Sequence, residues 1–141
     1  MYLTPHLSAD INTVQIVGHH VISGDARGTV VLWDLTHSPS ALPWSKKTDE
    51  YVASLDFADY QGVSALRVAN NWMVVATTRG CICLFDLAAQ RRARLLQGHA
   101  GEVHCVAINE ERDLILSGSR DHCAKVCNFL CLQQLHNYLL S

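Results

Sequence analysis

The stretch of residues 95–129 constrains the fold more than any other part of the chain. It alternates apolar and polar residues in three short runs, which are bounded by the turn signals Gly98-His99, Asn109-Glu110 and Arg120-Asp121. Alternation with a period of two, interrupted by Gly, Asn and Asp, is typical of half-buried strands in a tight antiparallel meander. The stretch therefore predicts strands and no helix.

The same unit recurs twice upstream. Residues 21–35 align with residues 115–129 without a gap, and residues 74–87 align with one deletion in the turn. The anchor positions are separated by 52 residues (33 to 85) and 42 residues (85 to 127); they are Trp33, Phe85 and Cys127. A four-stranded blade takes about 40–45 residues, so the second spacing fits directly and the first requires an insertion.

Four short motifs connect these units to a known family. Gly98-His99, Ser117-Gly118-Ser119, Asp121 and Trp33-Asp34 resemble the Gly-His, Ser-Gly-Ser, turn Asp and Trp-Asp signatures of the WD-repeat β-propellers. The resemblance covers nearly the whole chain and is strongest in the third unit. It implies an all-β partial propeller of about three four-stranded antiparallel blades, in a family that binds partners and rarely catalyses.

The units predict one incomplete propeller domain with three blades. We expect them at residues 1–57, 58–97 and 98–141, with an insertion loop at 36–49 that holds two of the three prolines. The strands are expected at 12–17, 20–24, 29–35 and 51–57, then 63–69, 72–77, 81–87 and 92–97, and the last, outer strand at 131–140. Because propellers close with about four to eight blades, three would leave apolar faces open. We therefore expect a fragment of a longer propeller, or a chain completed by further blades or assembly.

Composition narrows the class of partner. Apolar residues make up 49% of the chain and charged residues 17%, with a net charge of −2, which gives no general attraction to nucleic acid or an anionic membrane. Residues 1–10 lack a secretory pattern, and no apolar run approaches the roughly 18 residues of a spanning helix. The six cysteines fall within strand patterns, which favours reduced thiols in the cytosol or nucleus. Other proteins are the expected partners.

The resemblance also implies a buried structural clamp. In the WD-repeat family a His, a strand Ser or Thr, a turn Asp and a strand Trp form a hydrogen-bonded chain. Here His99, Ser117 and Asp121 match, but Cys127 stands in place of the Trp. The same three residue types could also form a nucleophilic triad, although Ser117 lacks a G-x-S-x-G elbow. The structural interpretation is favoured over a serine-type hydrolase.

The clamps of the other two units are expected to be incomplete. The first unit keeps Ser23 and Trp33 but has Arg27 where the turn Asp would stand. The second unit has Thr77 near the hydroxyl position, Phe85 for the Trp and Arg79 in its turn.

The turn arginines suggest a binding surface. Arg27, Arg79 and Arg120 fall in corresponding turns, which in this family lie on one rim of the ring. Three guanidiniums there could hold a phosphorylated or acidic peptide, or they could simply be solvated. Trp44 in the insertion loop could anchor a partner or fold back on its blade.

The expected function is that of a non-catalytic interaction scaffold or adaptor. The narrower alternative is the substrate-recognition part of a ubiquitin ligase, and a purely structural subunit also stays open. No cofactor is predicted. The cysteines and histidines lack the C-x-x-C spacing of a zinc knuckle, so no metal is predicted either; those considered are Cys81, Cys83, Cys123, Cys127, His104 and His122.

Overall fold

Eleven β-strands form the described part of the chain. The computed structural model describes residues 9–34, 62–89, 91–129 and 134–139, and only the backbone of 33–34 and 134–139. The strands are β1 (Ile11–Val17), β2 (His20–Asp25), β3 (Val30–Asp34), β4 (Val63–Ala69), β5 (Trp72–Thr77), β6 (Cys81–Asp86), β7 (Arg91–Gln97), β8 (Val103–Asn109), β9 (Leu114–Ser119), β10 (Cys123–Asn128) and β11 (Gln134–Leu139).

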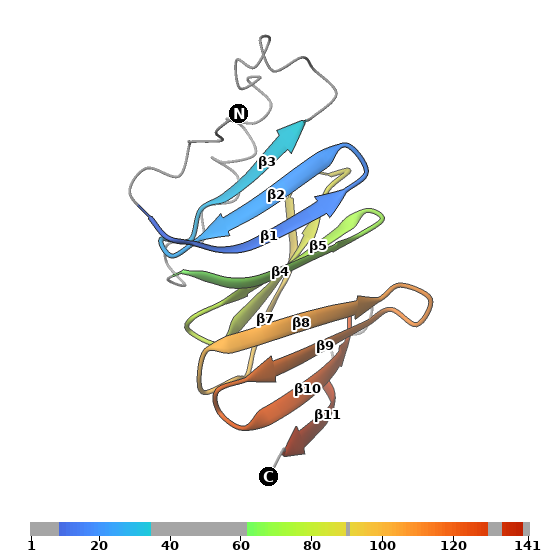
Figure 1. The fold of residues 1–141 in the computed structure, drawn as a ribbon. Coiled ribbons are helices and arrows are strands. Elements are labelled where there is room, and N and C mark those ends of the chain that lie inside the picture. Colours follow the sequence, from blue (N-terminus) through green and yellow to red (C-terminus); the bar gives the residue numbers. More distant parts are fainter. Residues whose placement is uncertain (1–8, 35–61, 90, 130–133, 140–141) are drawn as a thin grey trace.

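The strands form three antiparallel sheets, each a simple meander. The first sheet holds β1 to β3, the middle sheet β4 to β7 and the third sheet β8 to β11, all paired in chain order. Figure 1 shows the sheets stacked one after another, with β1, β4 and β8 in series along one side. The expected strands of the first and middle sheets lie within one residue of those observed. The expected strand at 51–57 and the insertion loop at 36–49 lie outside the described residues.

The three sheets share one register between their second and third strands. Val21 pairs with Trp33, Met73 with Phe85, and Ile115 with Cys127. The second unit therefore begins at Met73 and aligns without a gap, so the deletion expected from the sequence is wrong. The sequence alignment matched Val74 to Val21 because both are valines, whereas hydrogen bonding between the strands fixes the true register.

The first joint lies between the first and middle sheets. Its buried cluster combines Ile22 and Val30 with side chains from the middle sheet that include Leu66 and Phe85. Two amides of β1 also reach the backbone of β4. The Gln15 side chain accepts a hydrogen bond from Val68 N (2.7 Å) and donates one to Val68 O (3.2 Å), and Asn12 donates to Val63 O (2.9 Å). These bonds satisfy backbone groups at the strand edge that no neighbouring strand pairs.

The second joint lies between the middle and third sheets. Its cluster packs Val74, Ile82 and Leu84 against Val106 and Ile115 of the third sheet. The Trp72 and Phe129 rings meet there, with centroids 5.6 Å apart. Alternation along each strand thus sends neighbouring residues of the middle sheet into different joints, so that Phe85 packs in the first and Leu84 in the second.

Each outer sheet also exposes apolar side chains. Val14 and Ile16 of β1 are 56% and 69% exposed, and Leu116 of β9 is 47% exposed. Because Gln15 points to the middle sheet, alternation places Val14 and Ile16 on the opposite face of the first sheet. Within the described ranges the chain has no helix long and apolar enough to cross a membrane.

Candidate functional site

One turn follows the second strand of each sheet, and the three turns are structurally equivalent. They span residues 25–29, 77–81 and 119–123. In each turn the fourth residue donates its N–H to the first residue's carbonyl at 3.2 Å and has a positive φ: 93° at Gly28, 85° at Gly80 and 67° at His122. The turns therefore share one backbone conformation, although their sequences differ.

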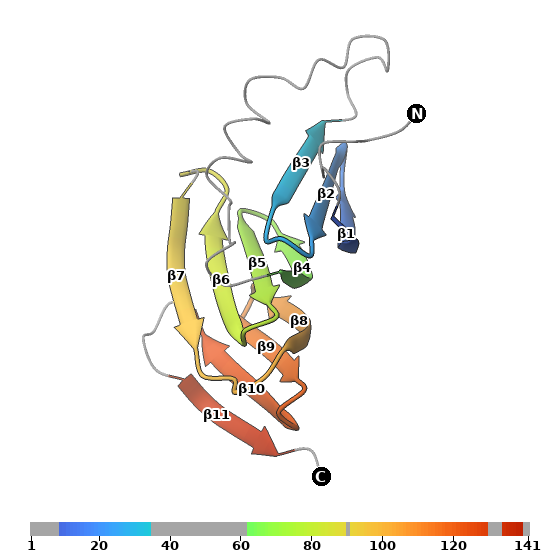
Figure 2. The same cartoon turned by 90° about the vertical axis from the view of Figure 1, so that its left-hand side faces the viewer.

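Contacts through intervening segments join these turns along one edge of the stack. A Cβ added to Gly62 would lie 2.6 Å from the Ala26 carbonyl oxygen, and Gly62 accepts the Thr78 N–H at 2.9 Å. A Cβ on Gly80 would lie 2.4 Å from the carbonyl oxygen of His99. Farther along, Arg120 N donates to Glu102 O at 2.8 Å. Figure 2, which faces this edge, shows the three turns in series. We call this edge the turn rim.

The three candidate arginines all lie on the turn rim and are exposed. Arg27 and Arg79 occupy the third position of their turns, where the third turn has Asp121. Arg120 occupies the second position, one residue earlier, and is not a strict equivalent of the other two. Trp44, the fourth predicted partner-binding residue, lies outside the described residues.

The structure joins His99, Ser117 and Asp121 in one hydrogen-bonded chain. His99 Nδ1 lies 2.9 Å from Asp121 Oδ2, and His99 Nε2 lies 2.8 Å from Ser117 Oγ. His99 comes from the linker between β7 and β8, Ser117 from β9, and Asp121 from the third turn. The chain therefore ties the connection between two sheets to a strand and a turn of the third sheet.

Asp121 is the electrostatic centre of this network. Its Oδ2 also accepts the Ala100 N–H at 2.9 Å, and its Oδ1 accepts the Cys123 N–H at 2.9 Å. Burial acts to raise the pKa of the Asp121 carboxyl, but the hydrogen bonds from His99, Ala100 and Cys123 outweigh it and hold that pKa well below its ordinary value. The carboxylate is thus an ionised acceptor that fixes the His99 ring and two backbone segments.

The network differs from the expected family clamp at its last position. Cys127 is buried, but its sulfur lies 3.6 Å from Asn128 O, and Ser117 Oγ has its second contact, at 3.5 Å, with the carbonyl oxygen of Lys125. Of the other predicted clamp residues, Ser23 is buried in β2 and Trp33 lies in β3.

The first two turns close in other ways. In the first turn, Asp25 Oδ1 accepts the N–H groups of Arg27 and Thr29, both at 2.9 Å. In the middle turn, Thr77 Oγ1 accepts the Cys81 N–H and donates to Cys81 O, both at 3.2 Å. Sequence reasoning missed Asp25 in this role and placed Thr77 one residue out of register. The signal available was a short polar side chain at the first position of a turn.

The surroundings of Ser117 differ from those of a catalytic serine. The distances resemble those of a Ser-His-Asp triad, but Ser117 lies within β9, which pairs with both β8 and β10. The backbone N–H groups of a central strand are committed to its neighbours and cannot form an oxyanion hole. Burial also raises the pKa of the Cys83 thiol to about 12, so this cysteine is a poor nucleophile.

Across the described ranges there is no cluster of three or more His, Cys, Asp or Glu side chains that could hold a metal ion. Cys81, Cys83, Cys105, Cys123 and Cys127 are free thiols.

Comparisons with known proteins agree with this architecture. Residues 90–128 match the WD domain, G-beta repeat family, a span that runs from β7 of the middle sheet through β10 of the third. The chain is 27% identical over 128 residues to "Restriction of telomere capping protein 1" of Lodderomyces elongisporus, covering 84% of this chain and 11% of that protein. It is 30% identical over 112 residues to "Anaphase-promoting complex subunit cdc20" of Dictyostelium discoideum, covering 79% and 20% respectively.

A solved structure shows the same fold. The WD40 β-propeller domain of Doa1 superposes with a TM-score of 0.70 at 16% identity, covering 94% of this chain and 42% of that one. The chain thus spans less than half the length of each of these three proteins. The motifs, the repeated sheets and these similarities lead to one conclusion: the chain belongs to the WD40-repeat family and forms part of a β-propeller.

Proposed function

We propose that this chain is a non-catalytic adaptor whose turn rim binds an acidic or phosphorylated segment of a partner protein. WD40 domains generally mediate protein interactions. The observation that carries the proposal is the presence of three exposed arginines, Arg27, Arg79 and Arg120, in three equivalent turns along one edge.

The chemistry of the rim supports an anionic partner. Guanidinium groups bind carboxylate and phosphate through paired, charge-assisted hydrogen bonds. Two acidic side chains in these turns, those of Asp25 and Asp121, are engaged by backbone N–H groups, and Asp25 is buried. Glu102 is half-buried beside Arg120. The arginine side chains therefore contribute most of the exposed charge of the turns themselves.

Rim turns also suit recognition for a structural reason. Their backbones are held by hydrogen bonds within each turn, and their exposed side chains vary from sheet to sheet. A rigid scaffold that presents variable side chains is the usual arrangement of a binding surface.

A peptide array with phosphorylated and unphosphorylated sequences tests the proposal. The triple variant Arg27→Ala, Arg79→Ala, Arg120→Ala should bind the selected acidic peptides at least about tenfold more weakly, because three charged contacts are lost. The control is Arg67→Ala, Arg91→Ala, Arg112→Ala, which removes the same charge from exposed positions in β4, in β7 and in the turn between β8 and β9. Equal binding by both triple variants would refute the proposal.

Presentation of such a segment to a ubiquitin ligase is the narrower form of the same proposal. It requires that the full-length protein also contact a ligase, which co-purification of the full-length protein tests. A hydrolase centred on Ser117 is the competing proposal, favoured only by its 2.8 Å contact with His99. Esterase activity that disappears in Ser117→Ala would support it over the adaptor.

A further inference from the structure

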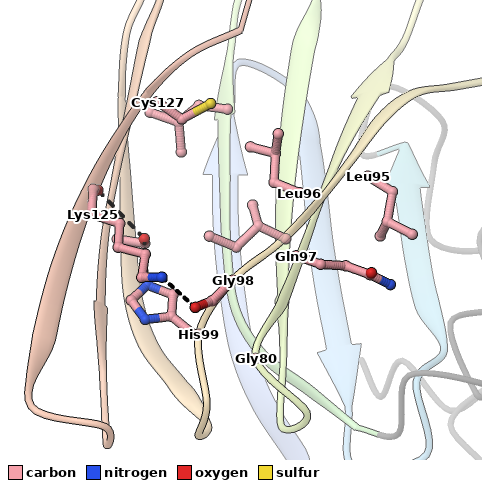
Figure 3. A pocket seen from close by; sticks show the side chains of 11 residues that line it. Gly80, Leu95, Leu96, Gln97, Gly98, His99, Lys125 and Cys127 are labelled. Carbon is pink, nitrogen blue, oxygen red and sulfur yellow. Dashed lines mark hydrogen bonds between the residues drawn. The ribbon is translucent and has the colours of Figure 1, made fainter. Parts of the chain in front are cut away.

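A pocket of about 200 Å³ opens between the middle and third sheets. Apolar side chains line its walls, among them Ile82, Leu96 and Ile115, and Cys127 contributes a sulfur. Figure 3 shows Cys127 and Lys125 on one strand of the third sheet, with Leu96 of the middle sheet opposite. No rim arginine lines the pocket, so it is a feature separate from the proposed function.

The shared register explains why the space is there. Cys127 occupies the position that holds Phe85 in the middle sheet and Trp33 in the first. Phe85 is 1% exposed and packs in the first joint. The third sheet has the same backbone position but a side chain without a ring, so the second joint lacks an aromatic group where the first joint has one.

One end of the pocket is polar and presents a hydrogen-bond acceptor. Ser117 Oγ lies 2.8 Å from His99 Nε2 and 3.5 Å from the Lys125 carbonyl oxygen. If the hydroxyl donates to His99, its oxygen keeps two lone pairs; if it accepts from His99, one lone pair is left. Because the Asp121 carboxylate accepts from Nδ1, the ring is either the Nδ1–H tautomer or the imidazolium, and in both forms the Ser117 oxygen keeps a lone pair for one further donor in the pocket.

The Lys125 ammonium lies beside this end. It donates to the carbonyl oxygen of Gly98, and both residues line the pocket. A cation there attracts the face of an aromatic ring, and the sulfur of Cys127 favours contact with a ring as well.

We propose that this pocket binds a small planar aromatic molecule with one N–H donor, such as an indole. The ring would fill the space of the missing aromatic side chain, and its N–H would donate to Ser117 Oγ. A dry apolar cavity of 150 Å³ is enough to bind benzene, so a pocket of about 200 Å³ has room for a single ring system. By filling the second joint, the ligand would stabilise the packing of the third sheet on the middle sheet.

Titration of the ¹⁵N-labelled chain with indole, followed by NMR, tests the proposal. We expect saturable shifts of the Gly80, Gln97 and Gly98 amides with a Kd below about 1 mM. 1-Methylindole has the same ring but no N–H donor, so it should bind about fivefold more weakly. Absence of saturable shifts at millimolar indole would overturn the proposal.

Two variants fill the pocket by different amounts. Cys127→Trp should abolish indole binding, and the smaller Cys127→Leu should weaken it, so a folding defect in the first leaves the second as a test. Indole binding that persists unchanged in either folded variant would place the ligand elsewhere and refute the assignment. The triple rim variant should bind indole as the unmodified chain does, which separates this result from the fate of the peptide proposal.

Discussion

Equivalent backbone positions carry different kinds of side chain in the two joints of the molecule. In the first joint, the middle sheet presents Val75, Cys83 and Phe85 to the first sheet, and all three are buried in one apolar cluster. In the second joint, the third sheet presents Ser117, Lys125 and Cys127 from the equivalent positions. At these positions the first joint presents only carbon and sulfur, whereas the second presents a hydrogen-bonded serine, a lysine and a cysteine that line a pocket.

This difference shows that one sheet geometry accepts two ways of holding neighbours together. Apolar burial stabilises the first joint in proportion to the area removed from water and does not depend on direction. The network of the second joint is directional: it fixes the linker between β7 and β8 to the third turn through Asp121.

Removing the aromatic ring from the first joint should have the largest effect. Phe85→Ala deletes a fully buried ring and should lower the free energy of unfolding by about 3–5 kcal/mol. Cys127→Ala at the equivalent position of the second joint removes only a sulfur beside an existing pocket and should cost about 1 kcal/mol. Urea denaturation of both variants measures the difference, and equal losses would contradict the contrast between the joints.

The second joint should also be sensitive to substitution at the backbone contact between the middle turn and the linker that joins β7 to β8. Gly80 has a φ of 85°, and an added Cβ would lie 2.4 Å from the His99 carbonyl oxygen. Gly80→Ala should therefore cost about 3 kcal/mol, from backbone strain together with displacement of the linker. Gly18 is the matched control, because its φ is 59° and nothing lies within 4 Å of the added Cβ.

Gly18→Ala should cost only about 1 kcal/mol, since strain alone remains. Thermal melting of the two alanine variants makes the comparison. If both melt at the same temperature, the linker does not pack tightly against the middle turn.

The network of the second joint should respond to acid. The pKa of the Asp121 carboxyl is lower in the folded chain than its unfolded value of about 3.9, so the ionised form stabilises the fold above that pH. This stability is lost as the pH falls below about 4 toward the folded pKa. Asp121→Asn should cost about 2 kcal/mol at pH 7, and the gap to the unmodified chain should narrow near pH 3.

Asp86 provides an internal reference for that measurement. The pKa of the Asp86 carboxyl is also lowered, mainly by the hydrogen bond from the Ala89 N–H and next by that from Asn71. Both the unmodified chain and the Asp121→Asn variant keep Asp86. Its contribution to the acid response therefore cancels in the difference between the two proteins. A gap that stays constant from pH 7 to pH 3 would show that the charge of Asp121 does not stabilise the joint.

The strands were predictable from the sequence because alternation and turn residues report local structure. Residues 63–69 and 72–77 were placed with their observed bounds. The register of the second unit was not predicted correctly. Positions 74 and 21 are both valine, but in the sheets the residue equivalent to Val21 is Met73. Register depends on pairing between strands, which a motif comparison does not measure.

The contacts within the two joints were harder to predict from the sequence. His99, Ser117 and Asp121 could be singled out from their motifs, and the structure brings them within hydrogen-bonding distance. The Gln15 bridge to Val68 could not be foreseen, because 53 residues separate its two ends. The pocket beside Cys127 depends on how two sheets pack, although the change from an aromatic residue to a cysteine was visible in the repeat.

The smallest expected effect concerns the third turn, where the sequences of the turns diverge most. His122 has a φ of 67° at the position occupied by Gly28 and Gly80 in the other turns. His122→Gly removes a left-handed strain of about 1–2 kcal/mol but adds about 0.5–1 kcal/mol of chain entropy to the unfolded state. The net gain should be about 0.5 kcal/mol, measurable as a small rise in Tm. A loss of stability would mean that the exposed His122 side chain makes a contact worth more than the strain, and that the third turn differs from the other two in energy as well as in sequence.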